Sequence, residues 1–107
     1  MAKLELISSA QVNLLNEWLD LKSALEGSSS NTLLAYKRDL IDFFSFLTLY
    51  TGCKSGVSQL EAVDQASMRS WMAENRRSGK TSRSIARQLS SVKSFYKWFA
   101  KRRGIDP

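Results

Sequence analysis

The 107-residue chain contains no histidine, one cysteine and one proline. Histidine is the commonest general base and a frequent metal ligand, so its absence excludes His-dependent catalytic triads and His-ligated metal sites. Cys53 alone cannot form an intrachain disulfide or a Cys-only zinc cluster. The chain also lacks an apolar run of about 18 residues, and Met1–Gln11 has no apolar signal-peptide core. We therefore expect a cytoplasmic, soluble and non-secreted protein.

Motifs for catalysis and phosphate binding are also missing. Ser28-Ser29-Ser30 has no accompanying base, and the carboxylates are scattered along the chain. The stretch Ser78-Gly79-Lys80-Thr81 contains Gly-Lys-Thr but lacks the upstream glycine and the preceding strand of a phosphate-binding loop. Cys53, in a glycine-flanked segment, is interpreted as an incidental free thiol. We expect no catalytic residue in this chain.

Positive charge is concentrated in the last third of the sequence. The whole chain has 16 Lys+Arg against 10 Asp+Glu, a net charge of +6. From Met1 to Asn75 there are 6 basic and 9 acidic residues, whereas Arg76 to Pro107 has 10 basic residues and a single acid, Asp106. This asymmetry predicts a polyanionic partner, either nucleic acid or an acidic membrane surface.

Apolar residues recur at helical spacing in the first half of the chain and predict two helices. The first follows a Ser8–Gln11 capping box and ends at Gly27. Its apolar stripe comprises Leu14, Trp18, Leu21 and Leu25. The second starts near Asn31 or Thr32 and ends around Tyr50–Gly52. Its apolar face comprises Leu33, Tyr36, Leu40, Phe43, Phe44 and Leu47, and its opposite side comprises Arg38, Asp42 and Ser45.

Two further helices are predicted in the second half, after a loop at Gly52–Gly56. Asp64 is the expected N-cap of a short helix with Met68, Trp71 and Met72 on its apolar side. Thr81 or Ser82 caps the last helix, from about Ser82 to Arg103, and Gly104 stops it. The apolar stripe of this helix comprises Ile85, Leu89, Val92, Tyr96 and Phe99. Because no segment alternates as a strand would, the predicted fold is an all-α bundle of four main helices.

The polar side of the last helix is the strongest functional signal. It comprises Arg83, Arg87, Ser90, Ser91, Ser94, Lys97 and Lys101. Arginine can contact guanine bidentately, serine can contact phosphates or base edges, and the major groove of a duplex admits an α-helix. The alternatives are a solvated basic face and a docking surface for an acidic protein. Membrane binding is less favoured because the large apolar residues are needed to close the bundle.

The tyrosines invite comparison with nucleophiles, but their positions indicate packing. Tyr36 has the spacing of Leu33 and Leu40, and Tyr96 has the spacing of Val92 and Phe99. We therefore expect both rings in the core, with the hydroxyl groups at its edge or hydrogen-bonded.

Two segments resemble a known family. The run SNTLLAYKRDL at 30–40, with Phe43-Phe44 and Phe46-Leu47 after it, is similar to the second helix of the N-terminal core-binding domain of tyrosine recombinases. The run TSRSIARQLSSVKSFYKWF at 81–99 is similar to the fourth helix of that domain, especially in the Xer branch. Gly104–Pro107 resembles the start of the linker to the catalytic domain. The resemblance spans about Ser8 to Pro107.

This resemblance implies that residues 1–107 form a single SAM-like core-binding domain, one half of a clamp around duplex DNA. The recombinase's catalytic half would follow Pro107, so we expect this chain to be non-catalytic. The resemblance also implies that no metal or cofactor is needed. The first helix would contribute to contacts between protomers in a synaptic tetramer. Carried over by position, the DNA-facing residues are Thr32, Ala35 and Arg38 in the second helix, with Arg83, Ser84, Arg87 and Ser91 in the fourth.

Overall fold

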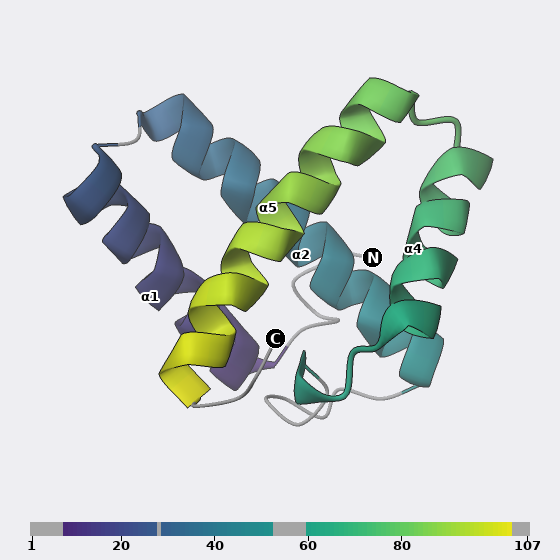
Figure 1. The fold of residues 1–107 in the computed structure, drawn as a ribbon, viewed down its shortest axis with the longest axis horizontal. Helices are drawn as coiled ribbons and strands as arrows, with labels where there is room; N and C mark the ends of the chain where they lie inside the picture. The colour runs from purple at the N-terminus through teal and green to yellow at the C-terminus, as the bar shows by residue number, and fades with distance from the viewer. Residues whose placement is uncertain (1–7, 28, 53–59, 104–107) are drawn as a thin grey trace.

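The computed structural model describes residues 8–27, 29–52 and 60–103, and the described part is helical with no strand. The helices are α1 (Ser9–Glu26), α2 (Ser30–Thr51), α4 (Gln65–Arg77) and α5 (Ser82–Arg103). In Figure 1, α5 crosses α2 near the centre of the molecule, with α1 and α4 on opposite sides of the crossing. The all-α fold of four main helices is confirmed. The expected loop residues 53–56, with Cys53, and the expected stop at Gly104 lie outside the described residues.

Local hydrogen bonds at the helix ends explain where the helices begin. Ser8 and Gln11 form the predicted capping box, with the Gln11 backbone N–H donating to Ser8 Oγ at 3.2 Å. Asp64 caps α4 as predicted, and the hydrogen bonds donated by Ser67 lower the pKa of this carboxyl. The Ser84 backbone N–H donates to Thr81 Oγ1 at 3.1 Å, so Thr81 caps α5. The α2 helix begins at Ser30, slightly earlier than expected, because Ser29 acts as its N-cap.

An aromatic cluster at the crossing of α2 and α5 forms the centre of the core. Phe95 of α5 is completely buried and contacts Phe44 of α2 at 5.4 Å and Trp18 of α1 at 5.6 Å between ring centroids. Phe43 of α2 contacts Trp71 of α4 at 5.0 Å. One cluster therefore joins all four helices. The predicted stripe of α5 supplies three more buried side chains, Ile85, Val92 and Phe99.

Three side chains of α1 and α2 lie on different faces from those expected. Leu21 and Leu25 were expected in the apolar stripe of α1, but they are 38% and 75% exposed. Figure 1 shows that α5 covers the first half of α1 and diverges from its C-terminal end, where α2 is the neighbouring helix. Ser45 was expected on the polar side of α2 but is buried, because α4 packs against that side and Ser45 lies in the cavity between the two helices.

Both tyrosines pack as predicted. Tyr36 is half-buried with its ring 5.4 Å from Trp18. The Tyr96 ring lies 6.0 Å from Phe43, and its hydroxyl donates a hydrogen bond to the Leu60 carbonyl at 3.1 Å. Burial raises the pKa of the Tyr96 phenol well above its usual value. The phenol therefore stays neutral in the folded chain.

Tyr96 variants test this packing. Tyr96→Phe should lower the free energy of unfolding by about 1 kcal/mol, because it removes one hydrogen bond and keeps the ring. Tyr96→Ala should lower it by about 3–5 kcal/mol, because it leaves a cavity beside Phe43. The difference between wild type and Tyr96→Phe should shrink above about pH 10, where the unfolded phenol ionises and the folded one does not. Urea denaturation at several pH values measures all three effects. An unchanged unfolding midpoint for Tyr96→Ala would contradict the docking of α5.

Candidate nucleic-acid interface at the crossing of α2 and α5

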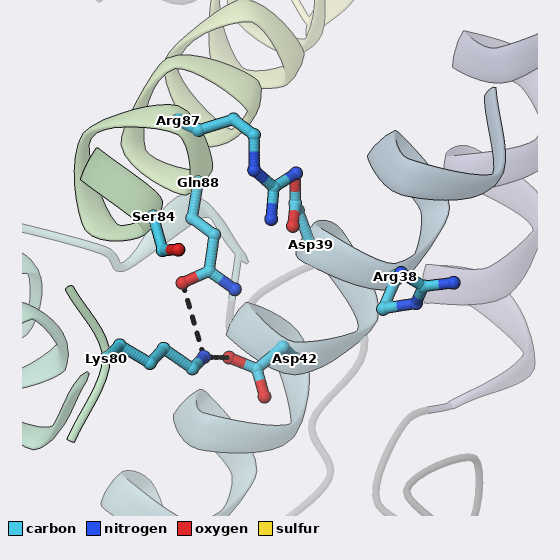
Figure 2. Close-up of a pocket in the computed structure, with 7 residues that line it drawn as sticks. All are labelled: Arg38, Asp39, Asp42, Lys80, Ser84, Arg87 and Gln88. Carbon is cyan, nitrogen blue, oxygen red and sulfur yellow. Dashed lines mark hydrogen bonds and ion pairs between the residues drawn. The ribbon is translucent and has the colours of Figure 1, made fainter. Parts of the chain in front are cut away.

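A polar groove lies between α2 and the N-terminal part of α5. Its volume is about 330 Å³, and both helices and the segment before α5 line it. The lining residues are Arg38, Asp39, Asp42, Lys80, Ser84, Arg87 and Gln88. Figure 2 shows that Arg87 and Gln88 extend from α5 toward α2, whereas Arg38 points away from Lys80 and Asp42. The groove therefore combines cations from separate parts of the chain.

The buried carboxylate of Asp39 joins the two helices. Asp39 is 1% exposed, and its Oδ2 accepts hydrogen bonds from Arg87 Nη1 and Ser91 Oγ, each at 2.8 Å. Arg87 remains 53% exposed, so part of its guanidinium faces solvent. A charge-assisted hydrogen bond to a buried acceptor is stronger than an exposed surface ion pair. This contact therefore fixes α5 against α2 and fixes one edge of the Arg87 guanidinium.

A second polar contact closes the other end of the groove. The Lys80 ammonium donates to Asp42 Oδ2 and to Gln88 Oε1, each at 3.2 Å (Figure 2). Gln88 is buried at 6% exposure, whereas Lys80 and Asp42 are partly exposed. The contact connects the segment between α4 and α5 to α2. It orients the N-terminus of α5, where Thr81 and Ser84 lie, relative to α2.

The seven predicted DNA-facing residues fall into three sets: those that line the groove, those that lie on α2 and α5 outside it, and Ser91, which is buried. Arg38, Ser84 and Arg87 line the groove. Thr32 and Arg83 are exposed on the same two helices outside the groove lining, and Ala35 is half-buried there. The structure brings three of these six residues to one groove, and the role of all six in DNA contact stays a prediction.

Ser91 requires a correction. It was expected on the solvent-facing polar side of α5, but it is 3% exposed and donates its hydroxyl to Asp39. The Ser91 hydroxyl does not reach the surface. It is linked to the groove only indirectly, through the Asp39 carboxylate that also binds Arg87. The physical reason is that α2 crosses α5 at this position and covers it.

Sequence reasoning did not select Asp39, Lys80 or Gln88 as site residues. Asp39 had a detectable signal, because it follows Tyr36 by three residues and precedes Phe43 by four, in register with apolar positions of α2. A charged residue at such a position predicts a buried charge with a partner. Lys80 had no comparable signal, since its partner Asp42 lies 38 residues away in the chain.

The cations differ in whether they have an acidic partner. Among the described residues, five cations are ion-paired: Lys22, Arg77, Lys80, Arg87 and Arg102. Arg38 and Arg83 are exposed and have no ion pair with any residue in the described ranges. Over those ranges, no three His, Cys, Asp or Glu side chains gather as metal ligands would. No described helix is long and apolar enough to span a bilayer.

Serine variants test the buried network. Ser91→Ala should lower the free energy of unfolding by about 1–3 kcal/mol, because Asp39 loses one of its two hydrogen-bond donors. Ser90→Ala is the matched control, since it makes the same change in helix propensity at the exposed neighbouring position; it should alter stability by less than about 0.5 kcal/mol. Urea denaturation of both variants measures the difference. Equal midpoints would show that Ser91 is not part of a buried network.

Comparison with known proteins supports one family. Residues 15–104 match the family described as phage integrase, N-terminal SAM-like domain. The tyrosine recombinase XerC of Rickettsia typhi is 35% identical over 88 residues, covering 82% of this chain and 29% of that protein. XerC of Rhodospirillum centenum is 34% identical over 79 residues, covering 74% of this chain and 23% of that protein.

The chain thus spans less than a third of the length of these relatives. No solved structure matches it. The family match covers most of the sequence, including all of α2, α4 and α5. The chain belongs to the family of phage integrase N-terminal SAM-like domains, the domain found in tyrosine recombinases.

Proposed function

We propose that this chain binds duplex DNA sequence-specifically, as the N-terminal clamp domain of a tyrosine recombinase. The observation that supports this most directly is the polar groove at the crossing of α2 and α5, whose lining includes the exposed Arg38 of α2 and the exposed Arg87 of α5. Exposed Arg83, which has no ion pair with any described residue, adds a cation on the same helix as Arg87. Exposed arginines on two crossing helices suit a duplex, because phosphates line both sides of the groove that a helix enters.

Each proposed contact residue has a distinct chemical role. Arg38, Arg83 and Arg87 can donate to phosphates or bidentately to guanine. The Ser84 and Thr32 hydroxyls already contact the helix caps, at 3.2 Å from Thr81 Oγ1 and 2.9 Å from Ser29 Oγ. Their remaining hydrogen-bonding capacity suits phosphate oxygens near helix N-termini. Ala35 offers a small side chain where α2 would approach the duplex closely.

In the intact recombinase, this domain would position the duplex, and strand cleavage would be performed by a catalytic domain outside this chain. Other protomers of a synaptic tetramer would be further partners. The exposed leucines of α1, Leu21 and Leu25, together with Leu34 of α2, support this assembly, since three exposed leucines on adjacent helices suit a protein contact. Phage integration and chromosome-dimer resolution are both processes that such an assembly could serve.

Arginine variants test the DNA surface. Arg38→Ala and Arg83→Ala should each weaken duplex binding, by about 1–3 kcal/mol if the side chain contacts a base edge. If it contacts only phosphate, the loss should be equal for all sequences, and the salt slope should fall by about 1. Arg69→Ala, at an exposed position of α4, removes the same charge and serves as the control. Fluorescence anisotropy over a range of salt concentrations measures these slopes.

Two outcomes would contradict the proposal. Wild-type binding that is independent of salt would exclude a duplex contact based on phosphates. Equal losses for Arg69→Ala and Arg83→Ala would indicate a response to net charge with no defined interface. Salt-dependent binding to an acidic protein, with no binding to duplex, would favour the alternative of a basic docking helix.

The chain should not cleave DNA. It contains no histidine, and its two described core tyrosines, Tyr36 and Tyr96, are packed among aromatic rings, away from the groove. Incubation with supercoiled plasmid should therefore give no nicked product at concentrations that saturate duplex binding. Nicking that disappears in Tyr96→Phe or Tyr36→Phe would contradict the non-catalytic assignment.

A further inference from the structure

Asp39 is a buried carboxylate that packing alone does not require. Its Oδ2 has two donors, but its Oδ1 has no hydrogen-bond partner among the described residues. Removing a carboxylate from water is unfavourable, and an apolar residue at such a position is often as stable as a buried ion pair or more so. The presence of an incompletely satisfied charge at the crossing of two helices therefore points to a role beyond stability.

The contact geometry indicates what that role is. Arg87 has five N–H donors and uses Nη1 to bind Asp39. Because the side chain is 53% exposed, much of the planar guanidinium remains available to a ligand. Ser91 binds the same carboxylate oxygen from the next turn of α5, which fixes the position of the acceptor. The guanidinium is thus fixed at one edge and free at the other.

We propose that Asp39 is a positioning residue that orients Arg87 for contact with a base edge of the duplex, an inference that rests on the proposed function. Bidentate contact with guanine requires the planar guanidinium in one orientation, whereas contact with phosphate requires only its charge. An arginine released from Asp39 would still add affinity for every duplex. It would lose the fixed orientation that lets Arg87 bind one base sequence more tightly than another.

The experiment separates charge from orientation. A duplex enriched by the wild-type chain from a random-sequence library and a scrambled duplex of the same composition serve as probes. Their ratio of dissociation constants defines the specificity ratio. Asp39→Asn removes the carboxylate charge that holds Arg87. Glu17→Gln is the matched control, because it removes the charge paired with Arg102, also on α5 and outside the groove, with the same change in net charge.

Both variants should bind the scrambled duplex somewhat more tightly, by similar factors, because each adds one unit of positive charge. Asp39→Asn should reduce the specificity ratio about tenfold, within the range expected for one lost base contact. Glu17→Gln should leave the ratio within about twofold of wild type. Asp39→Glu, which keeps the charge and moves the carboxylate, should reduce the ratio without changing affinity for the scrambled duplex. It also provides the test where Asp39→Asn fails to fold, as monitored by circular dichroism.

A double-mutant cycle distinguishes positioning from a general structural effect. In an Arg87→Gln background, Asp39→Asn should cause no further loss of the specificity ratio, because the residue that it orients is gone. Equal losses with and without Arg87, or equal ratios for Asp39→Asn and Glu17→Gln, would overturn the inference and leave the proposed function intact. A wild-type chain that binds both duplexes alike, or neither, would instead overturn the sequence-specific function on which the inference rests.

Discussion

Phe95 occupies the centre of the packing between α5 and α2, with no exposed surface and with aromatic neighbours on α1, α2 and α5. Edge-to-face contacts such as those with Trp18 and Phe44 favour defined orientations over a freely sliding apolar surface. The angle and register at which α5 crosses α2 depend on this cluster. Every polar contact in the groove, including the one between Asp39 and Arg87, requires that register, because the partners come from different helices.

The polar contacts around this apolar centre differ in how much they contribute to the stability of the fold. The Asp39–Arg87 pair is buried on one side, so solvent screens it weakly, whereas Glu74–Arg77 and Glu17–Arg102 lie at the surface and contribute little to stability. The polar network at the crossing therefore adds specificity to the packing of two helices. The surface pairs mainly lower the number of cations free to attract a polyanion.

The net charge of the last third overstates the charge available to DNA. Several cations there are already neutralised by acidic residues from earlier in the chain, as Lys80 is by Asp42 and Arg102 by Glu17. Arg83 and Arg38 are exposed and have no ion pair with any described residue. A local surface on α2 and α5 is thus a better description of the proposed interface than a uniformly basic C-terminal third.

The sequence by itself determined the helices and their ends, because helical periodicity and capping are local: the Ser8–Gln11 box, the Asp64 cap and the extent of α5 were all predicted. It also determined that Tyr36 and Tyr96 pack in the core. Only the tertiary structure decided which polar residues become buried. Ser91 and Ser45 are covered by neighbouring helices, and Leu25 is not, because burial depends on which helix crosses at that position. Asp39 and Arg87 are 48 residues apart, and their pairing follows from the same crossing. No local sequence pattern indicates that Arg87 is the partner of Asp39.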